Sequence, residues 1–233
     1  MLPKTHTKRR KHQMKSRVAV AVIAAISLLA SAVILHPGVA FARPEYATPG
    51  REIAFIQSGS YSVDPLHTSV GFEVWHLGIA KVQGRFTKKS GKIVVNANDI
   101  TRSSVSFSIE ADSIDTAVAP RDQHLRSADF FEVAKYPQIR FESARIRKTE
   151  SGYVADGKLT MKAVTKDVSI PFKVYGPITD PWGGTRIGVV AEPITLNRQD
   201  FGIAYNDKLP DGTPAVGNEV TVHLALEAVL DKP

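Results

Sequence analysis

Cysteine does not occur in this chain of 233 residues. Its absence excludes disulfide bonds, thiolate metal sites, a cysteine nucleophile and a lipidated cysteine. A fold built from this sequence is therefore held together by its apolar core and not by covalent cross-links.

Acidic residues are missing from positions 1–42, which contain seven basic residues: Lys4, Lys8, Arg9, Arg10, Lys11, Lys15 and Arg17. The whole chain has 30 Lys and Arg residues and 23 Asp and Glu residues, so residues 43–233 contain 23 of each and are formally neutral. The excess positive charge is thus confined to the N-terminal segment. The remainder lacks the basic patch that nucleic-acid binding requires, and we expect no nucleic-acid partner.

The first 42 residues have the three parts of a secretory signal peptide. The basic stretch ends at Arg17, an uncharged apolar run covers residues 18–35, and Ala40-Phe41-Ala42 follows a Pro-Gly break as a signal-peptidase site. This pattern predicts cleavage after Ala42 and export to the periplasm. The alternative is a retained membrane anchor, because a helix over residues 18–35, rising about 1.5 Å per residue, barely spans about 30 Å of hydrocarbon.

Apolar and polar residues alternate with a period of two from Tyr61 onward, which is typical of strands with one buried face. The clearest segment is 104–111, where Val105, Phe107 and Ile109 alternate with serines. Turn signals rich in Gly, Pro, Asp and Ser separate the segments. The pattern predicts an all-β fold of about eight antiparallel strands in hairpin order, either an up-and-down barrel or a sandwich.

Two segments do not alternate. Residues 43–58 contain Pro44, Pro49 and Gly50 without a sustained pattern, and we interpret them as a linker before a domain at 59–231. Residues 120–132 contain helix formers, with Ser127 as a second N-cap. They predict one or two short helices across one end of the barrel.

Short motifs follow one another in order along residues 60–230. They are YSVD at 61–64, HLG at 76–78, GRF at 84–86, SIDT at 113–116, RDQHLRS at 121–127, DFF at 129–131, YP at 136–137, FES at 141–143, GKLT at 157–160, NR at 197–198 and DFG at 200–202. Together they resemble the YceI-like family of bacterial periplasmic polyisoprenoid-binding proteins, with Thr68 where the family usually has serine. The resemblance implies an eight-stranded, lipocalin-like antiparallel barrel that holds a long isoprenoid chain, without an established catalytic residue set.

The apolar strand faces alone do not distinguish a packed core from a cavity, and the resemblance favours a cavity. Small inward residues (Gly84, Ala111 and Ala191) would leave room inside, and phenylalanines would form a wall suited to an unsaturated hydrocarbon. No cofactor is expected beyond a bound isoprenoid lipid or quinone. The predicted ligand-binding residues are Phe72, Val74, His76, Phe86, Phe107, Ile109, Arg121, His124, Arg126, Phe141, Phe172 and Arg198.

Arg121, Asp122, His124 and Arg126 form a compact polar cluster with two interpretations. They cap the helix and tie it to the barrel by salt bridges, or they form a polar mouth that grips a phosphate or carbonyl head group. Arg198 is expected to point inward and to pair with Asp200 or Asp122.

Metal binding and catalysis find little support in the sequence. His67, His76 and His124 lack the tight spacing of metal ligands, and a triad of a serine with His67 and Asp64 lacks the Gly-x-Ser-x-Gly motif. We therefore expect a protein that sequesters or carries a quinone tail or polyprenyl phosphate and contacts a membrane transiently, either alone or as a homodimer. The alternatives are an enzyme acting on a similar ligand and a stress-induced structural module with a filled core.

If Ala42 ends a signal peptide, the mature protein begins at Arg43 and is recovered in the soluble periplasmic fraction of its host. N-terminal sequencing of the native protein tests this expectation. A membrane-bound form that retains residues upstream of Val18 would establish the anchor instead.

Overall fold

A computed structural model describes residues 56–232. The predicted leader (residues 1–42) and the linker up to residue 55 lie outside the described residues. No helix in the described part is long and apolar enough to cross a membrane.

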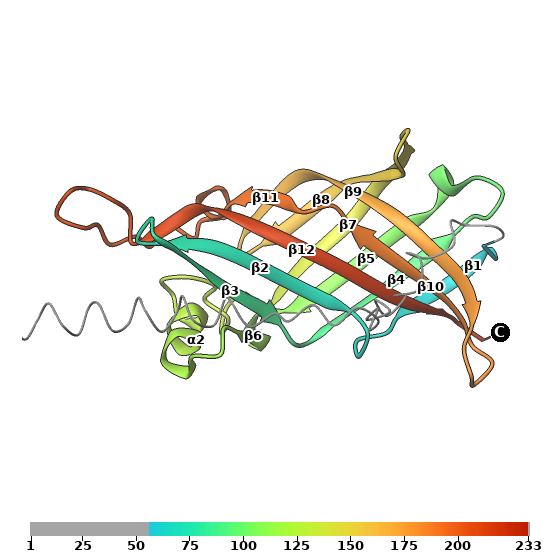
Figure 1. The fold of residues 1–233 in the computed structure, drawn as a ribbon, viewed down its shortest axis with the longest axis horizontal. Helices are drawn as coiled ribbons and strands as arrows, with labels where there is room; N and C mark the ends of the chain where they lie inside the picture. The colour runs from blue at the N-terminus through green and yellow to red at the C-terminus, as the bar shows by residue number, and fades with distance from the viewer. Residues whose placement is uncertain (1–55, 233) are drawn as a thin grey trace, which may run out of the picture. The chain divides into compact units, whose positions relative to one another are not determined.

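Eight antiparallel strands close into a barrel (Figure 1). Each strand of the ring pairs with the next, and the last pairs with the first. In ring order they are β1 (Gly59–Val63), β4 (Lys89–Val95), β5 (Ser104–Glu110), β7 (Gln138–Lys148), β8 (Tyr153–Met161), β9 (Val164–Thr179), β10 (Thr185–Ala191) and β12 (Val216–Leu230). The predicted eight-stranded antiparallel barrel is thus confirmed, and the sandwich alternative is wrong.

Four further strands extend this ring: β2 (Ser69–His76), β3 (Ala80–Phe86), β6 (Ile114–Asp115) and β11 (Ile194–Asn197). They join the ring through β12, which has 15 residues and is therefore longer than its neighbours β1 and β10. Its C-terminal part pairs with β1 and β10, whereas its N-terminal part pairs with β2 and β11. β3 pairs with β2, and β6 pairs with β3.

The register of the strands follows from their apolar faces. In β5 and β7, Phe107 lies opposite Phe141 and Ile109 lies opposite Ile139. A slip by one residue would turn all of these side chains to the outside, so burial of one face fixes the pairing.

The polar segment between β6 and β7 forms one α-helix, α2 (Ala119–Arg126), with Pro120 in its first turn. The second helix predicted from Ser127 does not form, because Ser127 ends α2 and its carbonyl accepts hydrogen bonds from the N–H groups of Phe130 (3.2 Å) and Glu132 (2.8 Å). The resulting turns pack Phe130 and the following Phe131 against the barrel end.

Short 3₁₀ helices occur at strand ends: η1 (Ile100–Arg102), η2 (Ala111–Ser113) and η3 (Arg198–Phe201). The alternation predicts Ala111 at the end of a strand. In the structure it belongs instead to η2.

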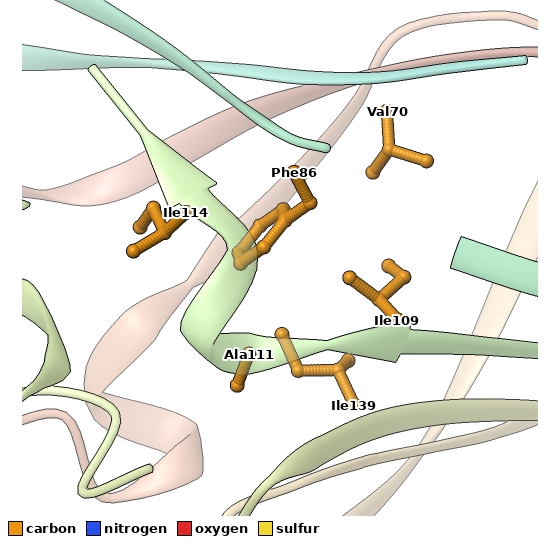
Figure 2. Packing of buried hydrophobic residues seen from close by; sticks show 6 residues of the cluster. All are labelled: Val70, Phe86, Ile109, Ala111, Ile114 and Ile139. Carbon is orange, nitrogen blue, oxygen red and sulfur yellow. The ribbon is translucent and has the colours of Figure 1, made fainter. Parts of the chain in front are cut away.

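Packed apolar clusters lie towards the two ends of the barrel. Figure 2 shows the first, around the bend between η2 and β6, with Val70, Phe86, Ile109, Ala111, Ile114 and Ile139. Leu125 and Phe131 pack against it from the α2 side. The second cluster joins β1 to β4, β10 and β12, and contains Tyr61, Ile93, Val95, Ile187 and Ala228.

Arg186 of β10 connects three segments that are distant in sequence. Its guanidinium donates to Asp180 (2.6 Å), Asp64 (2.7 Å) and Glu227 (2.5 Å). Asp64 lies in the β1–β2 connection, Asp180 in the β9–β10 hairpin and Glu227 in β12. The hydrogen bonds from Arg186 hold the pKa of both Asp64 and Asp180 below the ordinary range.

These pKa shifts predict how stability changes with pH. Because the two carboxyls have lower pKa values in the folded than in the unfolded protein, their stabilising contribution is complete above about pH 4 and is lost as the pH falls further. We expect Arg186→Gln to lower the Tm clearly at pH 7. The difference in Tm between the variant and the unchanged protein should become smaller as the pH falls below about 4.

Thermal unfolding followed by circular dichroism across this pH range measures the effect. Lys158→Gln is the matched control, because Lys158 and Asp167 form an exposed pair (2.9 Å) of the kind that contributes little. A constant difference in Tm at all pH values would contradict the role of Arg186.

Candidate ligand-binding cavity

The barrel interior contains two adjoining apolar compartments. Counted out to their openings, they enclose about 1110 Å³ and about 890 Å³ of empty space. The larger compartment extends towards α2, and the smaller extends towards β1 and η1. Both are lined by Phe107, Phe141, Ile170 and Leu224, so these four residues form a waist where the compartments meet.

The lining is almost entirely apolar. Arg198 is the one charged residue that lines the larger compartment, and Ser103 is the one hydroxyl residue that lines the smaller, within the residues that the structure describes. Such a surface offers dispersion contacts and exclusion from water over its whole length, with almost no groups to orient a polar ligand.

Some lining side chains keep part of their surface accessible although they face inward. Phe72, Val74, Phe107 and Leu224 are only half-buried, whereas other lining residues, such as Ile109 and Ile114 of the first packed cluster, are almost completely covered. A close-packed core would cover both groups alike. The middle of the barrel is therefore hollow.

Three phenylalanine rings lie against the barrel wall, above glycines of a neighbouring strand. A Cβ atom built on Gly84 would lie 2.3 Å from Phe72 Cζ, and one on Gly91 would lie 2.7 Å from Phe107 Cδ2. The same holds at Gly157, where the Cβ would lie 2.7 Å from the Phe141 ring. Because these glycines have no side chain, the rings can lie flat against the wall. The phenylalanines therefore line the interior without filling it.

This arrangement corrects the predicted role of the small residues. The space above Gly84 is occupied by the Phe72 ring, and Ala111 is buried in the first packed cluster. Only Ala191 lines a compartment, the smaller one, as expected.

Most of the predicted apolar site residues lie together in the cavity. The larger compartment is lined by Phe72, Val74, Phe86, Phe107, Ile109 and Phe141, and Phe172 lines the smaller. His76, Arg121, His124 and Arg126 line neither compartment. His76 is exposed at the end of β2, so its position does not support contact with a ligand in the barrel.

Arg198 lines the larger compartment, but its predicted pairing with Asp200 or Asp122 is wrong. Its buried guanidinium donates to the backbone oxygens of Gly217 (2.9 Å), Ile203 (2.7 Å) and Tyr205 (2.8 Å). Longer hydrogen bonds reach Val216 O and Asn218 Oδ1. The chain turns these carbonyls towards η3, so neutral acceptors and not a carboxylate satisfy the cation. Burial lowers the pKa of Arg198 from its ordinary value.

The polar cluster on α2 is engaged with the segment that precedes the helix. Arg121 donates to the side chain (2.7 Å) and backbone (2.8 Å) oxygens of Thr116, whose N–H donates to the buried Asp122 (2.9 Å). Arg126 donates to the carbonyls of Asp112 and Ile114, both at 2.6 Å. These contacts favour the interpretation in which the arginines attach the helix to the barrel, although by hydrogen bonds to neutral oxygens and not by salt bridges.

His124 helps to close the barrel end near α2. Its Nε2 atom lies 2.8 Å from Asp129 Oδ2, and its ring packs edge-on against Phe130 (5.1 Å between centroids) and Tyr205 (5.0 Å). These contacts connect the turn after α2 to the segment after η3. His124 therefore holds these two segments together at the barrel end.

Ligand atoms of Asp64, His67 and Glu227 lie within 4.8 Å of one another, a spacing that could hold a metal ion. Arg186 contacts both carboxylates and already supplies a positive charge. His67 Nδ1 lies 2.8 Å from Asp64 Oδ2 and is exposed, and no serine hydroxyl bonds to it in the described part. The contacts thus show an ion-pair cluster without the geometry of a catalytic triad.

Sequence reasoning missed part of the lining. The alternation within 220–226 contained the signal for Val220, Val222, Leu224 and Leu226, which line the cavity from β12. Phe130, Phe131 and Phe201 lie on turns or in η3, where no periodicity distinguishes inward from outward residues.

The closed eight-stranded barrel with a hollow apolar interior defines the class of lipocalin-like β-barrel proteins. The family model of the YceI-like domain matches residues 61–228, and the chain belongs to this family.

A protein named YceI from Salmonella arizonae is 35% identical over 177 residues, covering 75% of this chain and 89% of the relative. Among solved structures, Burkholderia cenocepacia BcnA has a TM-score of 0.60 at 21% identity, covering 71% of this chain and 98% of its own. A polyisoprenoid binding domain from Saccharophagus degradans, implicated in plant cell wall breakdown, has a TM-score of 0.54 at 15% identity, covering 75% and 100%. These two likenesses support the fold.

The pairing of Phe72 with Gly84 predicts the effect of a single added methyl group. We expect Gly84→Ala to push the Phe72 ring into the larger compartment, lowering the Tm and weakening the binding of an apolar fluorescent probe. Overpacking of this kind costs roughly 1–3 kcal/mol of stability.

The double variant Gly84→Ala/Phe72→Leu should recover probe binding and part of the Tm, because the shorter side chain leaves room for the methyl group, whereas Thr116 Cγ2, 2.8 Å from the added Cβ, must still shift. Gly71→Ala is the control, since its Cβ would meet no atom closer than 3.8 Å. Thermal melts and probe titrations compare the variants, and loss of binding in Gly71→Ala as well would refute the steric explanation.

Proposed function

We propose that this protein is an exported binding protein that holds the chain of a long isoprenoid lipid, such as a quinone or a polyprenyl phosphate, inside its barrel. The observation that carries the proposal is the hollow apolar interior, in which two compartments meet at a waist. A ligand that fills both must be long, thin and apolar.

An isoprenoid chain suits this space for energetic reasons. Burial of each methylene contributes roughly 0.8 kcal/mol, so a five-carbon unit contributes on the order of 2–3 kcal/mol after the costs of ordering. The rings of Phe72, Phe107 and Phe141 offer flat surfaces to unsaturated carbons. The polar head group belongs outside the barrel, because the N–H groups of Arg198 already donate to protein oxygens.

The same lining argues for binding over catalysis. In the described residues neither compartment contains a carboxylate, a histidine or a lysine that could act as a general base. A neighbour in fold, the polyisoprenoid binding domain from Saccharophagus degradans, supports the same class of ligand here. The signal-peptide pattern of residues 1–42 supports export, and the apolar ligand implies transient contact with a membrane for loading.

The depth of the cavity predicts a dependence on chain length. Affinity for prenyl alcohols should rise with each added isoprene unit and then reach a plateau when both compartments are full. Ala191→Phe should block the smaller compartment and move the plateau to shorter chains, leaving the affinity for short chains unchanged. Val190→Phe is the matched control, because Val190 is the exposed neighbour on the same strand and lines neither compartment.

Titration of a series of prenyl alcohols, with native mass spectrometry of the gently purified protein, measures these effects. A co-purified hydrocarbon in one-to-one ratio is expected. Affinity that does not depend on chain length would refute the proposed function.

A further inference from the structure

The hydrogen-bonded wall of the barrel is interrupted between β9 and β11. β10 pairs with residues 172–179 of β9, and Glu192 adds a last backbone hydrogen bond to Pro171 O (2.9 Å). At Pro193, which cannot donate a backbone hydrogen bond, the chain turns into β11, which among the described strands pairs with β12 alone (Figure 1). Residues 164–170 of β9 pair with β8 on their other side. Two strand edges therefore face each other without backbone pairing in the part of the chain that the structure describes.

A groove occupies the space between these edges. It encloses about 650 Å³, counted out to solvent, and is lined by residues 166–169 of β9 and 194–197 of β11, together with Asp200 and Phe201. Its outer rim is polar, with Lys166, Asp167, Ser169, Thr195 and Asn197.

Three apolar residues of this groove also line the larger compartment: Ile194, Leu196 and Phe201. They form a partition with the groove on one side and the hollow interior on the other. The groove and the cavity are therefore separated by side chains, without a hydrogen-bonded strand between them.

We propose that this groove is the lateral portal through which an isoprenoid chain enters and leaves the barrel. The inference rests on the proposed function and adds the route of exchange. Elsewhere in the ring a chain would have to break several backbone hydrogen bonds between paired strands. At the β9–β11 gap, rotation of the half-buried Ile194 and Leu196 side chains opens a path without breaking the pairing of β11 with β12.

The ends of the barrel are less suited to exchange. Towards α2, Phe130 and Ile203 are buried, and the rings of His124, Phe130 and Tyr205 contact one another. Towards β1, the second packed cluster contains Tyr61 and Ala228 with no exposed surface. Opening either end would disrupt a packed core.

Unpaired edges also invite a strand from another protein. The charged Lys166 and Asp167 on the β9 edge are typical of edges protected against such pairing, so an apolar chain is favoured over a partner strand. If the groove instead bound a partner strand, substitutions of the partition residues would not change the rate of lipid loading.

Because the chain contains no cysteine, two introduced thiols form a unique cross-linking pair. In Ser169→Cys/Thr195→Cys, a reducible bifunctional thiol reagent bridges the outer rims of the groove. Loading of a dansyl-labelled geranylgeranyl chain from phosphatidylcholine vesicles is followed by fluorescence before cross-linking, after it, and after reduction. We expect cross-linking to slow loading and release by at least about tenfold, and reduction to restore both rates.

Glu142→Cys/Lys158→Cys is the matched control, because these exposed residues face each other on the paired strands β7 and β8 and line neither the groove nor the cavity. Its cross-link should leave the rates unchanged. Equal loading with and without the Ser169–Thr195 cross-link overturns the portal and leaves the proposed function intact. Failure of the uncross-linked protein to bind the probe refutes the function itself.

A second variant tests the partition without any cross-link. Leu196→Ala should speed both loading and release, because it thins the partition between groove and cavity. Leu230→Ala removes a side chain of equal size that packs against the second cluster and lines neither the groove nor the cavity, so it should not speed either rate. Equal rates in the two variants would overturn the portal.

Discussion

The cavity depends on a short stretch of backbone pairing between the first and last strands of the barrel. Tyr61, Ser62 and Val63 of β1 pair with the end of β12, and this contact closes the ring. Tyr61 and its neighbour Ala228 have no exposed surface, so the closure is also the centre of a packed cluster. Because a closed sheet has no edge at this position, the apolar faces of the strands can surround a space instead of collapsing onto another layer.

The packed clusters towards the barrel ends and the hollow middle contribute unequally to stability, although several cluster residues, such as Ile109 and Ile187, also line the cavity. The clusters around Ile114 and Tyr61 and the hydrogen bonds of Arg186 support the barrel wall, whereas the middle contributes less packing because it is hollow. The glycines beneath Phe72, Phe107 and Phe141 maintain this division. A ligand that fills the interior would supply the missing contacts, and would therefore stabilise the folded state in proportion to its affinity.

Features that depend on the periodicity of the sequence could be predicted. Contacts with backbone groups that are distant in the sequence could not. Alternation identified the strands and the inward phenylalanines, and the family motifs identified the barrel and the polar cluster on α2. The partners of Arg198 could not be predicted, because they are carbonyls placed by the turn of residues 203–206 and the start of β12. The break between β9 and β11 was equally hidden, since both segments alternate normally and only the change of pairing partner separates them.

The backbone contacts of Arg198 have a consequence for how this part of the chain can vary. Its acceptors at positions 203, 205, 216 and 217 are main-chain oxygens, which every amino acid supplies. Side chains at these positions are therefore free to change without loss of the contacts, as long as the path of the chain is kept. Arg198 itself cannot be replaced in the same way. Its guanidinium carries five N–H donors, and side-chain changes at those four positions cannot supply these donors. A single buried cation can thus support a surrounding segment whose side chains are free to change.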